Sequence, residues 1–168
     1  SRVWSVLVCA LLFAFLCFQQ VPTIAFPYIN LDEQGHISYA LHLIQFGNGM
    51  PDLDKMRLLD FGTGLWTNDP NFINHPPFGY VLLNQITAFD SLEPSVRYGA
   101  VTLWTLGFVA ILTGLHLSGS FSNLGLIAAT VLCVLLKVPR FGATFSNDSV
   151  AFLGGSLVFA GIIALLNG

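Results

Sequence analysis

The residues best suited to chemistry in this chain follow its first apolar run, in the sequence NLDEQGHISYALHLIQFG that begins at Asn30. Asp32, Glu33 and His36 occur together there, in a chain of which only 9% of the residues are charged. In a helix over 34–46, Asp32 and His36 would be neighbours, because residues four apart share a helix face. Such a carboxylate can act as a general base on an acceptor hydroxyl or amine, or it can ligate a divalent cation.

A purely structural interpretation of the same residues is also open. Asp32 can cap the N-terminus of the helix, and Glu33 can be a solvated charge in its first turn. Glu33 is therefore the weaker candidate for chemistry, and Asp32, beside His36, is the stronger one.

A metal site is a further possibility. His36 and His75 lie in the same polar segment as several acids, and Asp32 and Asp148 are the candidate carboxylate ligands. No HxxxH or CxxC spacing is present, so the pattern gives a divalent cation as a possible cofactor and does not identify one.

Basic residues form the second candidate group. Lys137 and Arg140 flank a proline at the end of an apolar run, close to Asp148, and Arg97 begins another run. A phosphate at the level of the lipid headgroups would find charge-assisted donors there. The alternative for each residue alone is that its side chain extends to the membrane surface without binding anything.

The composition indicates what kind of secondary structure holds these acidic and basic residues in place. The chain has 168 residues, of which 54% are hydrophobic, and its mean hydropathy is +0.72. Soluble domains average about 25% charged residues, so the chain is predicted to be an all-α polytopic membrane protein. The net charge of −3 gives no reason to expect nucleic acid as a partner; membrane lipids are the expected surroundings.

About four transmembrane helices are predicted, because a bilayer requires about 20 apolar residues per crossing. The predicted spans are 3–26, 95–117, 121–138 and 148–166. In the last of these, Gly154, Gly155 and Gly161 would permit close helix contact.

The polar segment 27–94 is predicted to be an extracytoplasmic loop with two juxtamembrane helices, 34–46 and 77–89. The first would be amphipathic, with Ile37, Leu41 and Ile44 as its apolar stripe. The Gly- and Asp-rich sequence between the two helices is predicted to be irregular, with Trp66 as an interfacial anchor. Counting the crossings places the acidic cluster and Asn147-Asp148 on the same face of the membrane.

Four features in order resemble the GT-C class of polytopic glycosyltransferases, which includes protein O-mannosyltransferases and aminoarabinose transferases. They are the first span followed by NLDEQGHISYALHLIQFGNGMP, the motif NHPPFGYVLLNQI, the arginine that begins the second span, and PRFGATFSNDSVAFL before the fourth. Members of the class have an Asp-Glu pair after the first span and an (H/K)PP motif that begins a second juxtamembrane helix.

The resemblance implies catalytic roles for the first cluster. Asp32 matches the catalytic acidic position of the class, Glu33 is its companion, His36 is an active-site neighbour and His75 occupies the HPP position near the site. Members of the class usually have more spans, so the chain would be an N-terminal part of a larger fold whose remaining helices are partners. The fragment alone could be inactive.

The expected function is transfer of a sugar, with inversion, from a polyprenyl- or dolichyl-phosphate carrier to an acceptor. The lipid-linked donor is then a partner, and Lys137 and Arg140 are its expected phosphate contacts, together with His75, Arg97 and Asp148. The expected location is a plasma, inner or endoplasmic reticulum membrane, with the active site on the extracytoplasmic side. A non-catalytic assembly subunit and a transporter are the alternatives; a transporter would place its charges in the middle of the spans.

Overall fold

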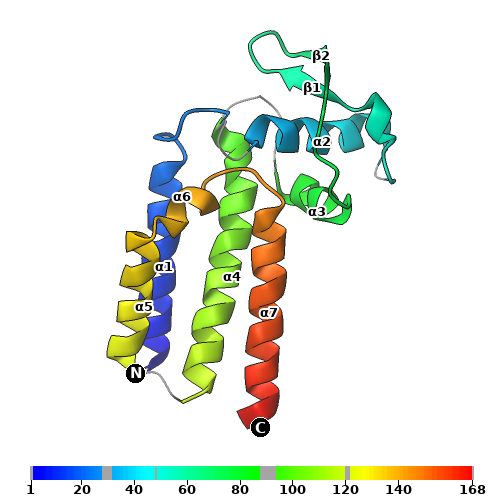
Figure 1. Ribbon diagram of the computed structural model, residues 1–168. Helices are drawn as coiled ribbons and strands as arrows, with labels where there is room; N and C mark the ends of the chain where they lie inside the picture. Colours follow the sequence, from blue (N-terminus) through cyan, green and yellow to red (C-terminus); the bar gives the residue numbers. More distant parts are fainter. Residues whose placement is uncertain (1, 28–31, 48, 88–93, 120–121, 168) are drawn as a thin grey trace.

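The protein is a bundle of helices with a smaller helical and β-hairpin layer across one end, as the computed structural model shows (Figure 1). The structure describes residues 2–27, 32–47, 49–87, 94–119 and 122–167. Within these residues the bundle consists of α1 (Arg2–Gln20), α4 (Arg97–Leu117), α5 (Asn123–Leu135), the short α6 (Val138–Gly142) and α7 (Asp148–Asn167). The layer across the end consists of α2 (Glu33–Phe46), η2 (Leu53–Lys55), β1 (Arg57–Asp60), β2 (Leu65–Pro70) and α3 (Phe78–Ile86), and we call it the cap. A further 3-10 turn, η3 (Pro94–Val96), leads into α4.

Three helices of the described residues, α1, α4 and α7, are long and apolar enough to cross a membrane. The first expected span is shorter than predicted, because α1 ends at Gln20 and not at residue 26. The third is also shorter: α5 has 13 residues, and Lys137 beyond it adopts a left-handed conformation with φ of 59°. That conformation separates α5 from α6, so the predicted continuous helix over 121–138 is wrong.

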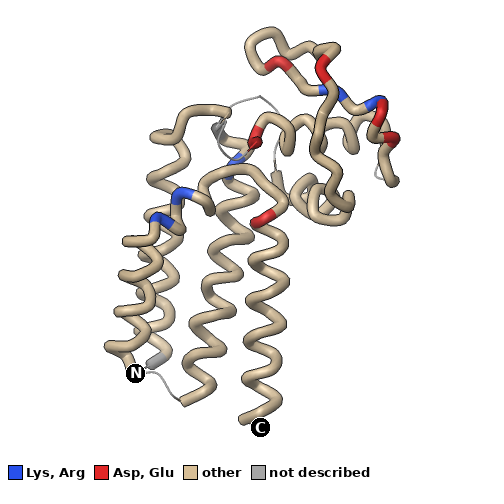
Figure 2. Tube along the Cα trace, viewed as in Figure 1, with Lys and Arg blue, Asp and Glu red and all other residues tan. Residues whose placement is uncertain are grey.

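Charged residues gather at the capped end of the bundle, and the rest of the described bundle is nearly free of them (Figure 2). The start of α2, the start of α4, α6 and the start of α7 all lie at this end (Figure 1). This arrangement agrees with the prediction that the acidic cluster and Asn147-Asp148 lie on one face. The other end holds the C-terminus of α4 and the start of α5.

The closest helix pair in the bundle is α4 with α7, and two glycines of α4 make the contact possible. A Cβ atom on Gly107 would lie 2.6 Å from the ring of Phe152 and 3.2 Å from the Cα of Leu153. A Cβ atom on Gly114 would lie 2.9 Å from the ring of Phe159. These glycines are seven residues apart and therefore on the same face of α4. The small residues at this interface belong to α4, whereas the sequence had suggested those of α7.

Gly107→Ala is therefore expected to destabilise the protein by about 1–3 kcal/mol, the usual cost of overpacking a close-packed site. The added methyl group would meet backbone as well as a ring, so a side-chain rotation alone does not relieve the overlap. Thermal unfolding in detergent measures the effect. Gly154→Ala is the matched control, because a Cβ there meets nothing within 4 Å; a lower melting temperature in both variants would contradict the assignment.

The first cap helix is buried along most of its length, which corrects the prediction of an amphipathic surface helix. Ile37, Tyr39, Ala40 and Leu43 are all fully buried, whereas Ile44, expected in the apolar stripe, is 52% exposed. The residues that pack with α2 come from the chain on either side of the hairpin, from α3, from η3 and the start of α4, and from the connection between α6 and α7: Met56, Ile73, Tyr80, Leu83, Val96, Ala100, Leu103 and Phe145. A helix covered on several sides does not show a single apolar stripe.

The segment predicted to be irregular contains an antiparallel β-hairpin. Leu59 pairs with Trp66 and Asp60 with Leu65. In the turn, Gly64 has φ of +71°, which glycine adopts without strain. The Asp60 carboxylate accepts a hydrogen bond from the backbone N–H of Gly62. The strands are short and polar, which is why their alternation is not visible in the sequence.

The second cap helix begins at Phe78, one residue after the predicted start at Pro77, and ends at Ile86. Thr87 has an extended conformation, so the predicted end at residue 89 is too late; residues 88 and 89 themselves lie outside the described residues. Gly79 of α3 lies against the side chain of Asn147, which leaves no room for a Cβ atom. This contact places α3 beside the start of α7.

Candidate functional site

A buried ion pair between Glu33 and Arg97 fixes the start of α2, where the candidate site residues lie. The side chains of Glu33 and Arg97 are both fully buried. The Arg97 Nε donates to one carboxylate oxygen of Glu33 at 2.8 Å, and Nη2 donates to the other at 2.6 Å. Such a bidentate pair fixes the orientation of both side chains.

The remaining N–H groups of Arg97 reach the chain that follows α1. They donate to the backbone carbonyls of Val21, Ile24 and Ala25 at 2.8 to 3.0 Å. The carboxylate of Glu33 also accepts from the backbone N–H of Phe145 at 2.8 Å. One ion pair therefore joins the end of α1, the start of α2, the start of α4 and the connection between α6 and α7.

This network corrects two sequence-based assignments. Glu33 was expected to accompany the catalytic acid, and Arg97 to contact a lipid phosphate. All five N–H groups of the guanidinium are already directed at protein acceptors, and neither side chain is exposed. The two residues fix the position of α2, and Asp32 precedes the first residue of that helix.

Asp32 itself is exposed at the start of α2, in a left-handed conformation with φ of 51°. Asp32 occupies the predicted N-cap position of α2, but its side chain makes no capping hydrogen bond. Aspartate tolerates this region of φ better than most residues. The residue lines a cavity of about 180 Å³ together with Gln34, Gly35, Leu58 and Phe72. The carboxylate is thus directed to an open space and not into the helix end.

His36, one turn further along α2, is buried and held by a tyrosine from α3. Its Nδ1 lies 2.6 Å from the hydroxyl of Tyr80. The ring of His75 stacks parallel to that of His36, with centroids 5.8 Å apart. The hydroxyl of Tyr39 donates to the backbone carbonyl of His75 at 2.8 Å, and the rings of Tyr39 and Tyr80 stack at 4.2 Å.

Burial determines the protonation states of this group. Burial lowers the pKa of His36 below the usual histidine value, and the nearby His75 lowers it further; Asp148, Asp32 and Glu33 act in the opposite direction. Burial raises the pKa of Tyr80, so its hydroxyl stays protonated, and His36 is neutral at pH 7. In the tautomer in which Tyr80 donates to Nδ1, His36 carries its proton on Nε2.

The low pKa of His36 predicts a pH dependence of stability. Unfolded histidine has a pKa of about 6.5, so as the pH falls through this value the unfolded state binds the proton before the folded state does. The free energy of unfolding should therefore decrease below about pH 6.5 and stay level above it. Thermal unfolding at pH 7.5 and pH 5 measures this; His36→Gln, which keeps a polar group of similar size, should reduce the difference. An unchanged pH dependence in that variant would contradict the prediction.

The structure thus gathers five of the sequence-predicted site residues. Asp32, Glu33, His75 and Asp148 are all close enough to His36 to change its pKa. Tyr80 was missed, since its contact with His36 spans 44 residues and has no local signal. Within the described part of the chain, no three His, Cys, Asp or Glu side chains form a group that could hold a metal ion. Asp32 and Asp148 therefore lack a third ligand there.

Lys137 and Arg140 line a different cavity. Its volume is about 280 Å³, and its other lining residues are Leu16, Gln20, Val134 and Pro139. The cavity combines two basic residues with apolar side chains of α1 and α5, at the capped end of the bundle (Figure 2). It shares no lining residue with the cavity beside Asp32.

Comparison of the chain with models of protein families, with curated proteins and with solved structures finds no match.

Proposed function

We propose that this protein is a membrane glycosyltransferase of the GT-C type. It transfers a sugar from a polyprenyl- or dolichyl-phosphate carrier to an acceptor on the extracytoplasmic face, with inversion. The observation that carries the proposal is the position of Asp32: an exposed carboxylate beside a cavity and near two stacked histidines, at the charged end of an apolar bundle. The Asp-Glu and HPP sequence features of the resemblance support the same assignment.

In the proposed reaction, the acceptor hydroxyl or amine attacks C1 of the sugar from the face opposite the carrier. The bond between C1 and the phosphate oxygen breaks as the new bond forms, and the electron pair leaves with the carrier phosphate. Asp32 takes the proton of the acceptor as general base. Neutral His36, oriented by Tyr80 through Nδ1, presents an Nε2–H donor, which can hold a polar atom of a substrate without adding charge.

The basic cavity has a separate part in this proposal. An anionic carrier is attracted to Lys137 and Arg140, and its hydrocarbon chain fits the apolar lining from α1 and α5. Since this cavity shares no lining residue with the one beside Asp32, Lys137 and Arg140 are assigned to capture of the carrier at the membrane surface. The stabilisation of the leaving phosphate requires a cation closer to C1.

The proposed membrane arrangement includes a fourth crossing by α5. This helix begins at the end of the bundle where α4 ends and runs back towards the cap (Figure 1). Its 13 residues span about 20 Å at 1.5 Å per residue, so Leu136, Lys137 and α6 must complete the crossing at the headgroup level. With four crossings, the cap and the start of α7 lie on the same side of the membrane, which the proposal takes to be the extracytoplasmic side.

The charge distribution favours an enzyme at the membrane surface over a transporter. Intramembrane ionisable residues mark the pathways of transporters. Here the described charges, apart from Arg2 at the start of α1, lie in the cap or at the capped end of the bundle and not halfway along α4 or α7 (Figure 2).

The proposal is tested by incubating the full-length protein, in detergent and in liposomes, with radiolabelled polyprenyl-phosphate sugars and candidate acceptors. Each reaction is run with EDTA, without EDTA, and with Mg²⁺ or Mn²⁺ added back. Transfer that survives EDTA supports Asp32 as a base, and transfer that EDTA abolishes and metal restores supports Asp32 as a metal ligand. No transfer and no binding with any of these donors would contradict the proposal and favour an assembly subunit.

A further inference from the structure

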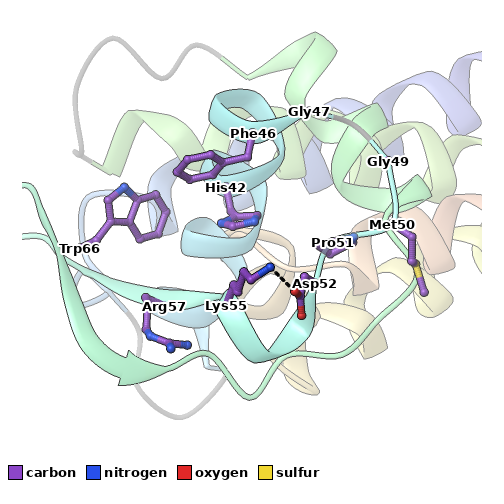
Figure 3. A pocket seen from close by; sticks show the side chains of 10 residues that line it. All are labelled: His42, Phe46, Gly47, Gly49, Met50, Pro51, Asp52, Lys55, Arg57 and Trp66. Atoms are coloured by element: carbon purple, nitrogen blue, oxygen red, sulfur yellow. Dashed lines mark ion pairs between the residues drawn. The ribbon is translucent and has the colours of Figure 1, made fainter.

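A second cavity of the cap is remote from Asp32 and has no part in the proposed reaction. Its volume is about 540 Å³, within the range of small-molecule sites. It lies at the C-terminal end of α2, whereas Asp32 lies at the start (Figure 1). The 14 residues of α2 separate the two by about 20 Å. The lining residues come from α2, the chain that follows it, η2 and the hairpin: His42, Phe46, Gly47, Gly49, Met50, Pro51, Asp52, Lys55, Arg57 and Trp66 (Figure 3).

One side of the cavity is a set of rings. Trp66, His42 and Phe46 lie near one another (Figure 3). The His42 ring contacts Phe46 at a centroid distance of 4.6 Å and meets Trp66 edge-on at 6.2 Å. The indole N–H of Trp66 donates to the side-chain carbonyl of Gln45 at 3.0 Å, which fixes the ring. A fixed aromatic side chain contributes contact area at little entropic cost.

Another side of the cavity carries charge. Asp52 and Lys55 form an ion pair at 2.8 Å, and both remain largely exposed (Figure 3). Arg57 uses Nη1 for the backbone carbonyls of Asp54 and Met56, and its Nε and Nη2 have no protein acceptor among the described residues. Burial lowers the pKa of His42, so at pH 7 the lining carries two positive charges and one negative charge.

We infer that this cavity binds a saccharide that carries an acidic group. A pyranose ring has an apolar C–H face that stacks on Trp66 or Phe46, and a rim of hydroxyls that Asp52 and Lys55 can bond. The excess positive charge and the open donors of Arg57 suit a carboxylate or phosphate on the sugar. A hydrocarbon chain in the same place would remove these charged groups from water without compensation.

The position in the cap agrees with a ligand that arrives from water. The hairpin that carries Trp66 lies on the far side of α2 from the bundle (Figure 1). Trp66 also contacts α2 through Gln45; its role as a membrane-interface anchor stays a prediction. The assignment of this cavity as a second contact for the acceptor, about 20 Å from Asp32, rests on the proposed function. The inference that the cavity binds a saccharide does not.

A glycan array with neutral, uronate-containing and phosphorylated oligosaccharides tests this inference on the full-length protein in detergent. We expect retention of acidic glycans, at least tenfold weaker binding by Trp66→Ala and Arg57→Gln, and partial recovery in Trp66→Phe. Trp4→Ala is the matched control, because Trp4 is an exposed residue of α1. Retention of no glycan, or equal binding by Trp66→Ala and wild type, would overturn the inference.

Saccharide binding by this cavity and sugar transfer at Asp32 can be disproved independently of each other. Asp32→Asn should retain glycan binding, and Trp66→Ala should still transfer sugar to a small acceptor that is too short to reach the cavity. Unchanged melting temperatures in the Trp66 and Arg57 variants confirm that loss of binding is not loss of folding. Loss of glycan binding in Asp32→Asn would place the saccharide at the other site and overturn this one.

Discussion

Arg97→Met is expected to lower the stability of the protein by about 3–5 kcal/mol, the usual effect of removing one partner of a buried ion pair. The variant leaves the carboxylate of Glu33 buried without its cation. It also leaves the carbonyls of Val21, Ile24 and Ala25 without their donor. Because native stability is typically about 5–15 kcal/mol, this loss removes a large share of it, and the melting temperature should fall markedly.

Thermal unfolding in detergent measures this effect. A thiol-reactive dye reports the unfolding, because Cys9 and Cys17 are buried in the folded protein and become exposed as the bundle unfolds. Arg97→Lys should be intermediate at best, since one ammonium group cannot replace five N–H donors in a planar fork. Asp52→Asn, which breaks the exposed pair with Lys55, is the control and should melt like wild type.

The double variant Glu33→Leu/Arg97→Met gives the sharpest test of the ion pair. Once neither charge is present, no uncompensated carboxylate remains, so the double variant should be more stable than the sum of the two single effects predicts. Strict additivity would show that the two side chains do not depend on each other, contrary to the structure.

Asp32→Asn is expected to reduce sugar transfer by about 10²–10⁴-fold, the usual contribution of a general base, while the melting temperature stays unchanged. The amide cannot accept the proton of the acceptor. Asparagine tolerates the left-handed conformation of this position as well as aspartate does, and the carboxylate makes no capping hydrogen bond that the change would remove. Turnover and melting temperature measured on the same preparation separate chemistry from folding.

Two carboxylate variants serve as controls for Asp32→Asn. Asp69→Asn, an exposed change on β2, should keep full activity. Glu33→Gln, next to Asp32 in the sequence, should lose activity together with its melting temperature, because Glu33 holds Arg97. Wild-type turnover in Asp32→Asn would remove Asp32 from the reaction.

Much of the fold follows from local sequence patterns. Apolar runs of bilayer length predict α1, α4 and α7, and the proline pair before Phe78 predicts the start of α3. The end of α2 at Phe46 follows from Gly47, whose φ of +109° is unfavourable for residues with a side chain. These features depend on residues within one or two turns of each other, so the sequence expresses them directly.

The hairpin and the early end of α5 are harder to predict from the sequence, for opposite reasons. The strand residues of β2 are mostly exposed, which leaves little apolar alternation to recognise. The run that forms α5 is mostly apolar up to Leu136, and the Lys-Val-Pro sequence that follows marks the end of the helix only to within a few residues.

The roles of the two adjacent acids were decided by tertiary structure alone. The sequence identified Asp32, Glu33, His36 and His75 as the chemically interesting residues, and by itself determined that they follow an apolar span. It could not show that Glu33 turns inward to Arg97, 64 residues later, while Asp32 stays exposed. The physical reason is that neighbours at a helix start point in different directions, and which of them meets the core depends on the elements packed against the helix. Burial and charge pairing are therefore properties of the assembled fold.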